Sequence, residues 1–437
     1  MRDPSFPLIR KNERLCREII DNDFSDYLKG PVIQGLVSRQ LLLDFIIEDQ
    51  ELIPEEINPV SYPFEWVADQ LYDAGILTLD IMEAIISTGY ELKDASAWNI
   101  IFKGSKALFC DHGSFSKINS HQWWGFGQFI RNFITPLIIE KKRSIRVSES
   151  FSIYRDGVPF EDLKKFGINI FDTGLAASLL YFFRGKDENN SDIKSMQGET
   201  NMEKSIELRR YLIKYLRYLM KSLKPTVDKT TWFDYTSNRA HYSSSALQEK
   251  KKTVEKLINK IGNISMAIDI GSNNGEFSQL LEKHSSKVVC LDIDHGAIST
   301  LYQDVEKNYY SFLINLENII GSRGFMGTEF KNISQRLLGS DLIIFLAIVH
   351  HLHISSSVPL NEIISSLSKL SPRYVIFEGV FFNDPMAELL AKKTNRNISY
   401  LNSDYYTETL SKDFEILETF KLEKETRQIF FLRNRLH

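Results

Sequence analysis

The sequence predicts an α/β protein built in two parts. In residues 231–437, five short apolar runs recur at regular intervals with helical or polar segments between them, which is typical of a parallel sheet flanked by helices. Two late runs, "FEILETFKL" and "RQIFFLRN", lie too close together for a helical crossover and are expected to pair as an antiparallel hairpin at the sheet edge. Residues 1–230 combine helical periodicity with short strands, which indicates a separate helix-rich α+β domain.

Length and composition bound the class of protein. The 437 residues are 43% hydrophobic and 25% charged, as in ordinary globular proteins, and suffice for roughly two or three domains. The formal net charge of −4 offers no basic surplus for nucleic acid or an anionic membrane. Because the N-terminus lacks a signal-peptide core and no apolar stretch reaches the ~20 residues that cross a bilayer, we expect a cytoplasmic protein. Cys16, Cys110 and Cys290 form no CxxC pair and are expected to be reduced and buried.

The first half opens with a strand-containing region, residues 1–60, followed by a helix up to about residue 90. Apolar residues at spacings of three and four predict that helix: Leu71, Ala74, Leu77, Ile81 and Ile85. "NIIFKGSKALFCDHG" then indicates two short strands around a Gly-Ser turn.

Residues 121–183 are expected to be mostly helical, and the polar segment 185–201 to be a surface loop. A helix over 202–223 should end before Pro225, which cannot continue it. Four aromatics in "QWWGFGQFIRNF" have helical spacing, which favours packing over a sugar-stacking surface: Trp123, Trp124, Phe126 and Phe129. Lysines 250–252, in the amphipathic segment "ALQEKKKTVEKLINKI", are interpreted as a solvated helix face.

The turn "DIGSNNG" follows the first strand of the second half. Ligands of open parallel sheets bind beyond the carboxyl ends of the strands, where this turn is expected. Asp269, directly before the turn, would repel a diphosphate and suits a cationic ligand such as S-adenosylmethionine (SAM), which carries a sulfonium and an α-amino group. Glycines allow close approach of the backbone, and amides at the start of the next helix can hold a carboxylate.

A second acid, Asp292, ends the next strand, where it can accept hydrogen bonds from two ribose hydroxyls. "DIGSNNGEFSQLL" followed by "VVCLDIDHGAIS" resembles the first two motifs of class I SAM-dependent methyltransferases, with Asn273 in place of the usual central glycine. The resemblance implies a Rossmann-like seven-stranded sheet, mostly parallel with an antiparallel terminal hairpin, and SAM as cofactor. It implies these cofactor-binding residues: Asp269, Gly271, Ser272, Asn273, Gly275, Asp292, Ile293, Asn315 (where many relatives have an acid) and Ala347.

The fourth strand ends in "AIVHHLH". Because this end faces the methyl group in the resembled fold, His350 or His351 is the candidate general base, and Glu378 after strand five an orienting or alternative proton acceptor. Strand four lacks the Asn-Pro-Pro-aromatic signature of many methyltransferases that act on nitrogen, which favours an oxygen acceptor. We expect no metal, because no carboxylate accompanies these histidines at ligand spacing.

Asp94, Asn99 and Asp111 have the order of a catalytic Asp, a metal-binding Asn and a metal-binding Asp in aminoglycoside-phosphotransferase-like and protein kinases, which this segment resembles. A kinase-like C-lobe is therefore expected for residues 1–230. Residues 31–60 contain no lysine for the phosphates, so the domain is interpreted as degenerate. Alternatively, these polar residues are caps and turn formers.

Over nearly its full length the chain also resembles a bacterial two-part family that includes nodulation host-specificity proteins, through "SYPFEW", "LKDASAWN", "DHGSF", "HHLHI" and "EGVFFNDP". The resemblance implies a sugar hydroxyl or other small metabolite as acceptor. Three hypotheses remain: a SAM-dependent methyltransferase, a bifunctional enzyme whose first half transfers phosphate, and a non-catalytic adaptor that binds SAM. The sequence does not specify an oligomeric state.

Overall fold

The computed structural model describes residue 6 and residues 8–11, 14–19, 22–169, 172–173, 201–226, 244–422 and 425–437. The chain divides into two compact units, an N-terminal unit (Met1–Thr226) and a C-terminal unit (Val227–His437). The boundary expected after residue 230 lies outside the described residues, as does the surface loop expected over 185–201, apart from Asn201.

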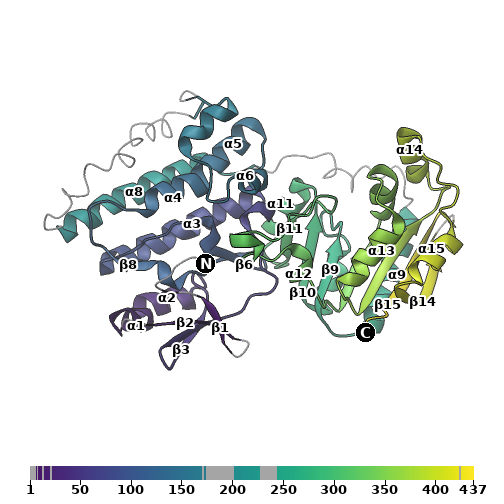
Figure 1. The fold of residues 1–437 in the computed structure, drawn as a ribbon, viewed down its shortest axis with the longest axis horizontal. Helices are drawn as coiled ribbons and strands as arrows, with labels where there is room; N and C mark the ends of the chain where they lie inside the picture. Colours follow the sequence, from purple (N-terminus) through teal and green to yellow (C-terminus); the bar gives the residue numbers. More distant parts are fainter. Residues whose placement is uncertain are drawn as a thin grey trace. The chain divides into compact units, whose positions relative to one another are not determined.

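Three small antiparallel sheets and a set of helices make up the described part of the N-terminal unit (Figure 1). One sheet has the order β1-β2-β4-β3, and the other two pair β6 with β7 and β5 with β8. The strands are β1 (Ile9–Lys11), β2 (Arg14–Glu18), β3 (Phe45–Glu48), β4 (Glu51–Pro54), β5 (Tyr90–Leu92), β6 (Ile100–Lys103), β7 (Lys106–Phe109) and β8 (Phe115–Lys117). The helices are α1 (Asn22–Lys29), α2 (Pro31–Ser38), α3 (Ala68–Ile85), α4 (Gly125–Phe129), α5 (Thr135–Arg143), α6 (Val147–Ile153) and α8 (Met202–Ser222).

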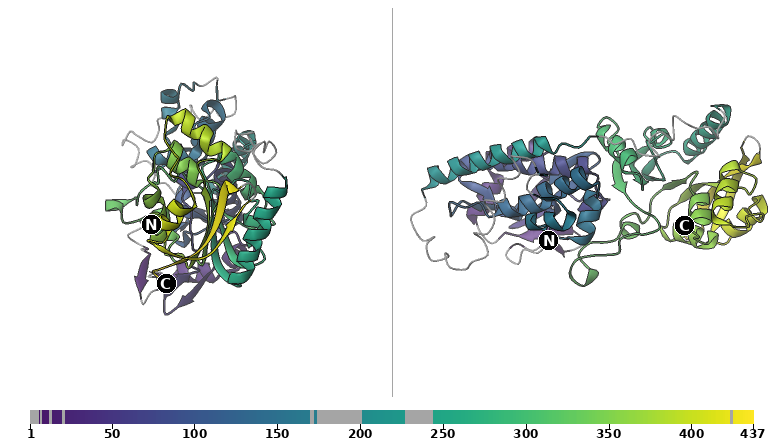
Figure 2. Two further views of the ribbon diagram at one scale, coloured as in Figure 1. Left: turned by 90° about the vertical axis from the view of Figure 1, so that its right-hand side faces the viewer. Right: turned by 90° about the horizontal axis from the view of Figure 1, so that it is seen from above.

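Helices α3 and α8 pack side by side in this unit, and α8 is the long teal helix in the right-hand view of Figure 2. Leu71, Ala74, Leu77, Ile81 and Ile85 are all buried in α3, which confirms the helix predicted from their spacing. The predicted 202–223 helix is confirmed as α8, and the predicted strand pair around the Gly-Ser turn as β6 and β7.

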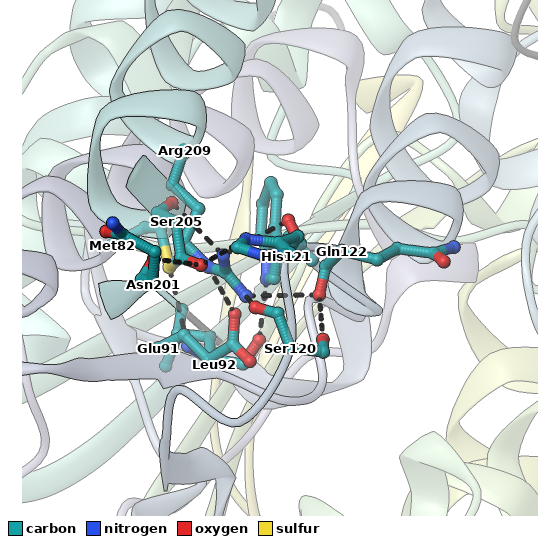
Figure 3. A network of polar contacts seen from close by, with 10 residues as sticks. Met82, Glu91, Leu92, Ser120, His121, Gln122, Asn201, Ser205 and Arg209 are labelled. Atoms are coloured by element: carbon teal, nitrogen blue, oxygen red, sulfur yellow. Dashed lines mark hydrogen bonds and ion pairs between the residues drawn. The ribbon is translucent and has the colours of Figure 1, made fainter. Parts of the chain in front are cut away.

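A buried charge fastens α8 to the rest of its unit (Figure 3). Arg209 is fully buried, and its Nε donates to Glu91 Oε2 of β5 at 2.7 Å. Its two terminal nitrogens donate to four main-chain oxygens, those of Ser120, His121, Gln122 and Ser205. The guanidinium thus donates to five acceptors, and these hydrogen bonds compensate for its burial.

A seven-stranded mixed sheet forms the centre of the C-terminal unit, in the order β11-β10-β9-β12-β13-β15-β14 (Figure 1). The first five are parallel, while β15 pairs antiparallel with β13 and with β14. The strands are β9 (Ile264–Ile270), β10 (Ser285–Asp292), β11 (Tyr310–Leu313), β12 (Leu342–Phe345), β13 (Tyr374–Val380), β14 (Phe414–Lys421) and β15 (Arg427–Asn434). The helices are α9 (Ser244–Ile261), α10 (Ser278–Leu281), α11 (His295–Gln303), α12 (Ile333–Arg336), α13 (Leu360–Lys369), α14 (Pro385–Thr394) and α15 (Ser403–Leu410).

The central strands of this sheet are apolar and buried almost throughout, as in α/β sheets covered on both faces. The five apolar runs coincide with β9 to β13, and the expected terminal hairpin is β14 with β15. The prediction of an α/β protein with a mixed sheet is therefore confirmed.

In the segment 122–133, two of the four aromatic residues expected to pack are buried. Trp123 and Phe129 are buried and Phe126 is half-buried, but the prediction is wrong for Trp124, whose side chain is 56% exposed. Trp123 and Trp124 immediately precede α4 and point to different sides, because neighbours along a helical turn do not share a face. The three cysteines are buried and free, as expected. Across the described residues, no helix combines the length and apolar character that a membrane span requires.

Candidate functional site

The strand order places two loops at a topological switch point. From β9 the chain proceeds outward to β10 and β11, then returns to the other side of β9 as β12. Crevices at such reversals, beyond the carboxyl ends of the strands, are where open α/β sheets bind ligands. The turn 271–275 leaves β9 here and the loop with Ala347 leaves β12. The two loops touch, because a Cβ on Gly271 would lie 2.5 Å from Cγ2 of Ile348.

The turn after β9 requires left-handed backbone at three positions. Gly271, Asn273 and Gly275 have φ of 76°, 47° and 80°, and Asn tolerates this conformation better than most residues. A Cβ on Gly275 would lie 2.5 Å from Cδ2 of Leu301. Both glycines are thus required by the protein's own packing, in addition to the expected approach of a ligand.

Asp292, the last residue of β10, holds this turn in place. Its Oδ2 accepts a hydrogen bond from the amide of Asn273 at 2.7 Å, and its Oδ1 accepts one from the amide of Asp294 at 2.8 Å. Burial raises the pKa of Asp292, while these amides oppose the rise. Each carboxylate oxygen keeps lone-pair capacity for a further donor.

Asp269 lies on the adjacent strand, opposite Cys290 of β10, and is 3% exposed. The Ser278 hydroxyl donates to its Oδ2 at 2.6 Å. The pKa of Asp269 is raised to about 6, mainly by burial and also by the charge of Asp292, while the Ser278 hydrogen bond and the charge of Lys250 act in the opposite direction. The structure therefore brings the two predicted acids close enough to influence each other's ionisation.

The other predicted cofactor residues lie around the same edge of the sheet. Ser272 is buried in the turn, and Ala347, with a φ of 58°, follows β12. Ile293 is 59% exposed after β10. Asn315 follows β11 on the surface, where its Oδ1 accepts the amide of Glu317 at 2.9 Å.

The helix expected directly after the turn is short. Residues 273–277 form turns, and α10 covers only Ser278–Leu281. A single helical turn at this distance aligns few peptide dipoles, so the helix N-terminus expected to hold a carboxylate is weak.

The prediction that the fourth strand ends in "AIVHHLH" is wrong, because β12 ends at Phe345 and residues 349–355 are helical. His350 lies in this helical segment and is buried, and its two ring nitrogens have no hydrogen-bond partner among the described residues. Its ring centroid is 4.2 Å from that of His351. Burial lowers the pKa of His350 well below its ordinary value, and the charges of His351, Arg427 and Lys250 contribute to the decrease. The pKa of His351 is lowered as well, again mainly by burial. The lowered pKa favours the neutral imidazole of His350, in which one nitrogen can accept a proton, although burial makes it a weaker base than an exposed histidine.

Glu378 lies inside β13 and not after it, which corrects the sequence-based placement. The strand continues to Val380 because Gly379 and Val380 still pair with β15. Glu378 is fully buried, with Oε2 2.7 Å from Lys250 Nζ and Oε1 3.6 Å from a terminal nitrogen of Arg427. Since two cations already face this carboxylate, an orienting role fits it better than proton acceptance.

The interpretation of residues 250–252 as a solvated face is wrong for Lys250, which is 2% exposed. A signal was present in the sequence, because Lys250 shares its helix face with Val254 and Leu257, both fully buried. Sequence reasoning also missed Arg427, which binds Asp384 through Nε at 2.7 Å. That pairing joins residues far apart in the chain, so no local pattern predicts it.

In the N-terminal unit, the structure brings Asp94, Asn99 and Asp111 together. Asn99 Nδ2 donates to the Asp94 main-chain oxygen and to Ser114 Oγ, both at 3.2 Å, and Ser114 Oγ donates to Asp111 Oδ2 at 2.6 Å. The pKa of Asp94 is raised by burial and by the charge of Asp111. Arg17, buried in β2, places a terminal nitrogen 2.8 Å from Asp111 Oδ1. Among the described residues, no cluster of three His, Cys, Asp or Glu has metal-binding geometry.

The chain is similar over nearly its full length to a nodulation protein, NoeA of Rhizobium meliloti (strain 1021). The two are 26% identical over 436 residues, which cover 96% of this chain and 88% of NoeA. This similarity confirms the resemblance to a family that includes nodulation proteins. No protein-family profile matches the chain.

Solved structures with partial similarity include several methyltransferases. N-methyltransferase NodS from Bradyrhizobium japonicum WM9 is 14% identical, with a TM-score of 0.33, over 44% of this chain and 98% of NodS. Magnesium protoporphyrin IX methyltransferase from Synechocystis PCC 6803, solved with bound SAM, is 14% identical, with a TM-score of 0.31, over 47% of this chain and 92% of that enzyme. The bifunctional kinase-methyltransferase WbdD is 15% identical, with a TM-score of 0.32, over 48% of this chain and 43% of WbdD.

Proposed function

We propose that the C-terminal unit is a class I SAM-dependent methyltransferase domain that transfers a methyl group to an oxygen acceptor. The observation that carries the proposal is the pair of acids, Asp269 and Asp292, on adjacent parallel strands at the topological switch point. Between them lies a turn with left-handed backbone at Gly271, Asn273 and Gly275.

The donor set of this site fits SAM. Asp269 is suited to the α-ammonium group, because a buried carboxylate binds a cation strongly, and Asp292 to the ribose hydroxyls. Turn residues 271–275, with Ile293, Asn315 and Ala347 around the same edge, would line the cofactor. SAM supplies a methyl group on a positively charged sulfur, and the protein's task is to hold the acceptor in line with it.

His350 is the proposed general base. Its neutral imidazole, buried and without a hydrogen-bond partner, can accept the proton that an acceptor hydroxyl loses. The lack of an Asn-Pro-Pro-aromatic signature after strand four supports an oxygen acceptor, and a sugar or glycan hydroxyl is the acceptor that the resemblance to the bacterial two-part family implies. Glu378, held between Lys250 and Arg427, would fix the wall of the site beside His350.

The N-terminal unit is proposed as a degenerate kinase-like domain that accompanies the methyltransferase domain. The contacts of Asp111 argue against phosphoryl transfer, because the Arg17 guanidinium already lies at Oδ1, where a magnesium ion would have to bind. A divalent cation would need to displace a fully buried arginine from this carboxylate.

Titration calorimetry with SAM tests the proposal. We expect dissociation constants in the micromolar range for the wild type and about 100-fold weaker binding by Asp292→Ala, because two hydrogen bonds to a charged acceptor are lost. The matched control is Glu408→Ala, which removes an exposed acid of α15 and should leave the affinity unchanged. Equal affinity in the wild type and Asp292→Ala, with both proteins folded, would contradict the proposed site.

A further inference from the structure

We propose that Lys250 is a positioning residue for the SAM site, whose buried ammonium holds the chain after the β9 turn and, with it, the Ser278 hydroxyl that contacts Asp269. The inference rests on the proposed function, because it concerns how that same site retains its affinity for a cationic cofactor.

Two contacts place the Lys250 ammonium between the sheet and the turn. Its Nζ donates to Glu378 Oε2 of β13 at 2.7 Å, and it lies 4.9 Å from the centroid of the Phe277 ring. The Lys250 side chain of α9 therefore contacts both Glu378 in the sheet and Phe277 after the turn. Phe277 is the neighbour of Ser278, which donates a hydrogen bond to Asp269.

The charges around Asp269 give this ammonium a chemical role. Asp269 faces Asp292 and the Cys290 thiol of β10 and the Ser278 hydroxyl of α10. Its pairing partner on β12 is the apolar Ile344. Burial and the charge of Asp292 favour the protonated form of Asp269, whereas Ser278 and Lys250 favour the anion. A protonated carboxyl carries no charge that could attract the ammonium group of SAM. Loss of Lys250 should therefore weaken SAM binding more strongly as the pH falls.

The pH dependence of SAM affinity separates this role from a merely structural one. A lysine that only tethers α9 to β13 would affect unfolding but would not change which protonation state of Asp269 binds the cofactor. Because the pKa of Asp269 is about 6, wild-type affinity should decrease as the pH falls through about 6. Asp269→Asn has no carboxylate to titrate, so it should bind SAM weakly at every pH. Loss of the pH dependence in this variant would show that the midpoint of the wild-type curve belongs to Asp269.

The test is calorimetry with SAM across about pH 5 to pH 9, where carboxyls with raised pKa values and histidines titrate. In Lys250→Met we expect the midpoint to move upward by about half a pH unit, which makes binding about threefold weaker at a pH below both midpoints. Lys250→Arg retains a cation and should keep the midpoint close to the wild-type value. The control Lys252→Met removes an exposed charge of the same helix and should leave the midpoint unchanged.

An unmoved midpoint in Lys250→Met, with SAM bound by the wild type, would overturn this inference and leave the proposed function intact. Failure of the wild type to bind SAM at every pH would overturn both. If Lys250→Met does not fold because Glu378 is left with less compensation, Lys250→Gln keeps a hydrogen-bond donor for Glu378 while it removes the positive charge. The same upward shift is expected in Lys250→Gln, and its absence would equally overturn the inference.

Discussion

Replacing Arg209 by methionine is expected to destabilise the N-terminal unit by about 3–5 kcal/mol, the usual cost of breaking a buried ion pair on one side. The variant leaves Glu91 buried without its cation and removes the donor to the three main-chain oxygens of residues 120–122 that hold α8 in place. Burial already raises the pKa of Glu91 and Arg209 opposes the rise, so without the guanidinium this carboxyl would remain buried in its neutral form.

Arg217→Met is the matched control for this prediction. Arg217 lies on the same helix and contacts Asp80 and Glu83, but its side chain is 25% exposed, and partly exposed pairs contribute only about 0–1 kcal/mol. Urea unfolding followed by tryptophan fluorescence is a suitable measurement, because Trp66 and Trp123 are buried in this unit. Equal midpoints for Arg209→Met and Arg217→Met would show that the Arg209 network does not stabilise the unit.

Replacing His350 by alanine is expected to lower the rate of methyl transfer by about 10²–10⁴-fold, the usual contribution of a general base. SAM affinity should remain close to that of the wild type, because the acids proposed to bind the cofactor lie on β9 and β10, whereas His350 follows β12. The measurement is single-turnover transfer from labelled SAM to compounds in an extract of the source cells, with the labelled product identified by mass spectrometry.

His353→Ala provides the comparison from the same helical turn. Both ring nitrogens of His353 are engaged, Nδ1 with the Val358 oxygen and Nε2 with the Tyr400 hydroxyl, each at 2.8 Å, so this ring cannot serve as a base. We expect a decrease of less than about tenfold. Unchanged transfer by His350→Ala would exclude His350 as the base. SAM binding without any labelled product in the wild type would favour the adaptor hypothesis.

Local patterns in the sequence were sufficient to predict the elements that position the site. Five apolar runs identified β9 to β13, because a strand buried on both faces has an apolar composition that is visible without its neighbours. The acids Asp269 and Asp292 were found for a similar reason, since each ends such a run and parallel strands bring their carboxyl ends to one edge.

Contacts between charged residues that are far apart in the chain were not predicted. Lys250 and Glu378 are 128 positions apart, and neither segment indicates that the other will neutralise it. Arg17 and Asp111 form a comparable pair in the N-terminal unit, where the sequence suggested a metal-binding Asp and the structure shows an arginine at that carboxylate. Buried charges are compensated by tertiary contacts, so their partners become visible only in the fold.

The most direct test of the account is a crystal structure of the full chain with S-adenosylhomocysteine (SAH), the product form of the cofactor. We expect SAH beside turn 271–275, with its ammonium group at Asp269 and its ribose hydroxyls at Asp292. Electron density for SAH at another place, or a ligand that leaves both carboxylates without contact, would contradict the central claim.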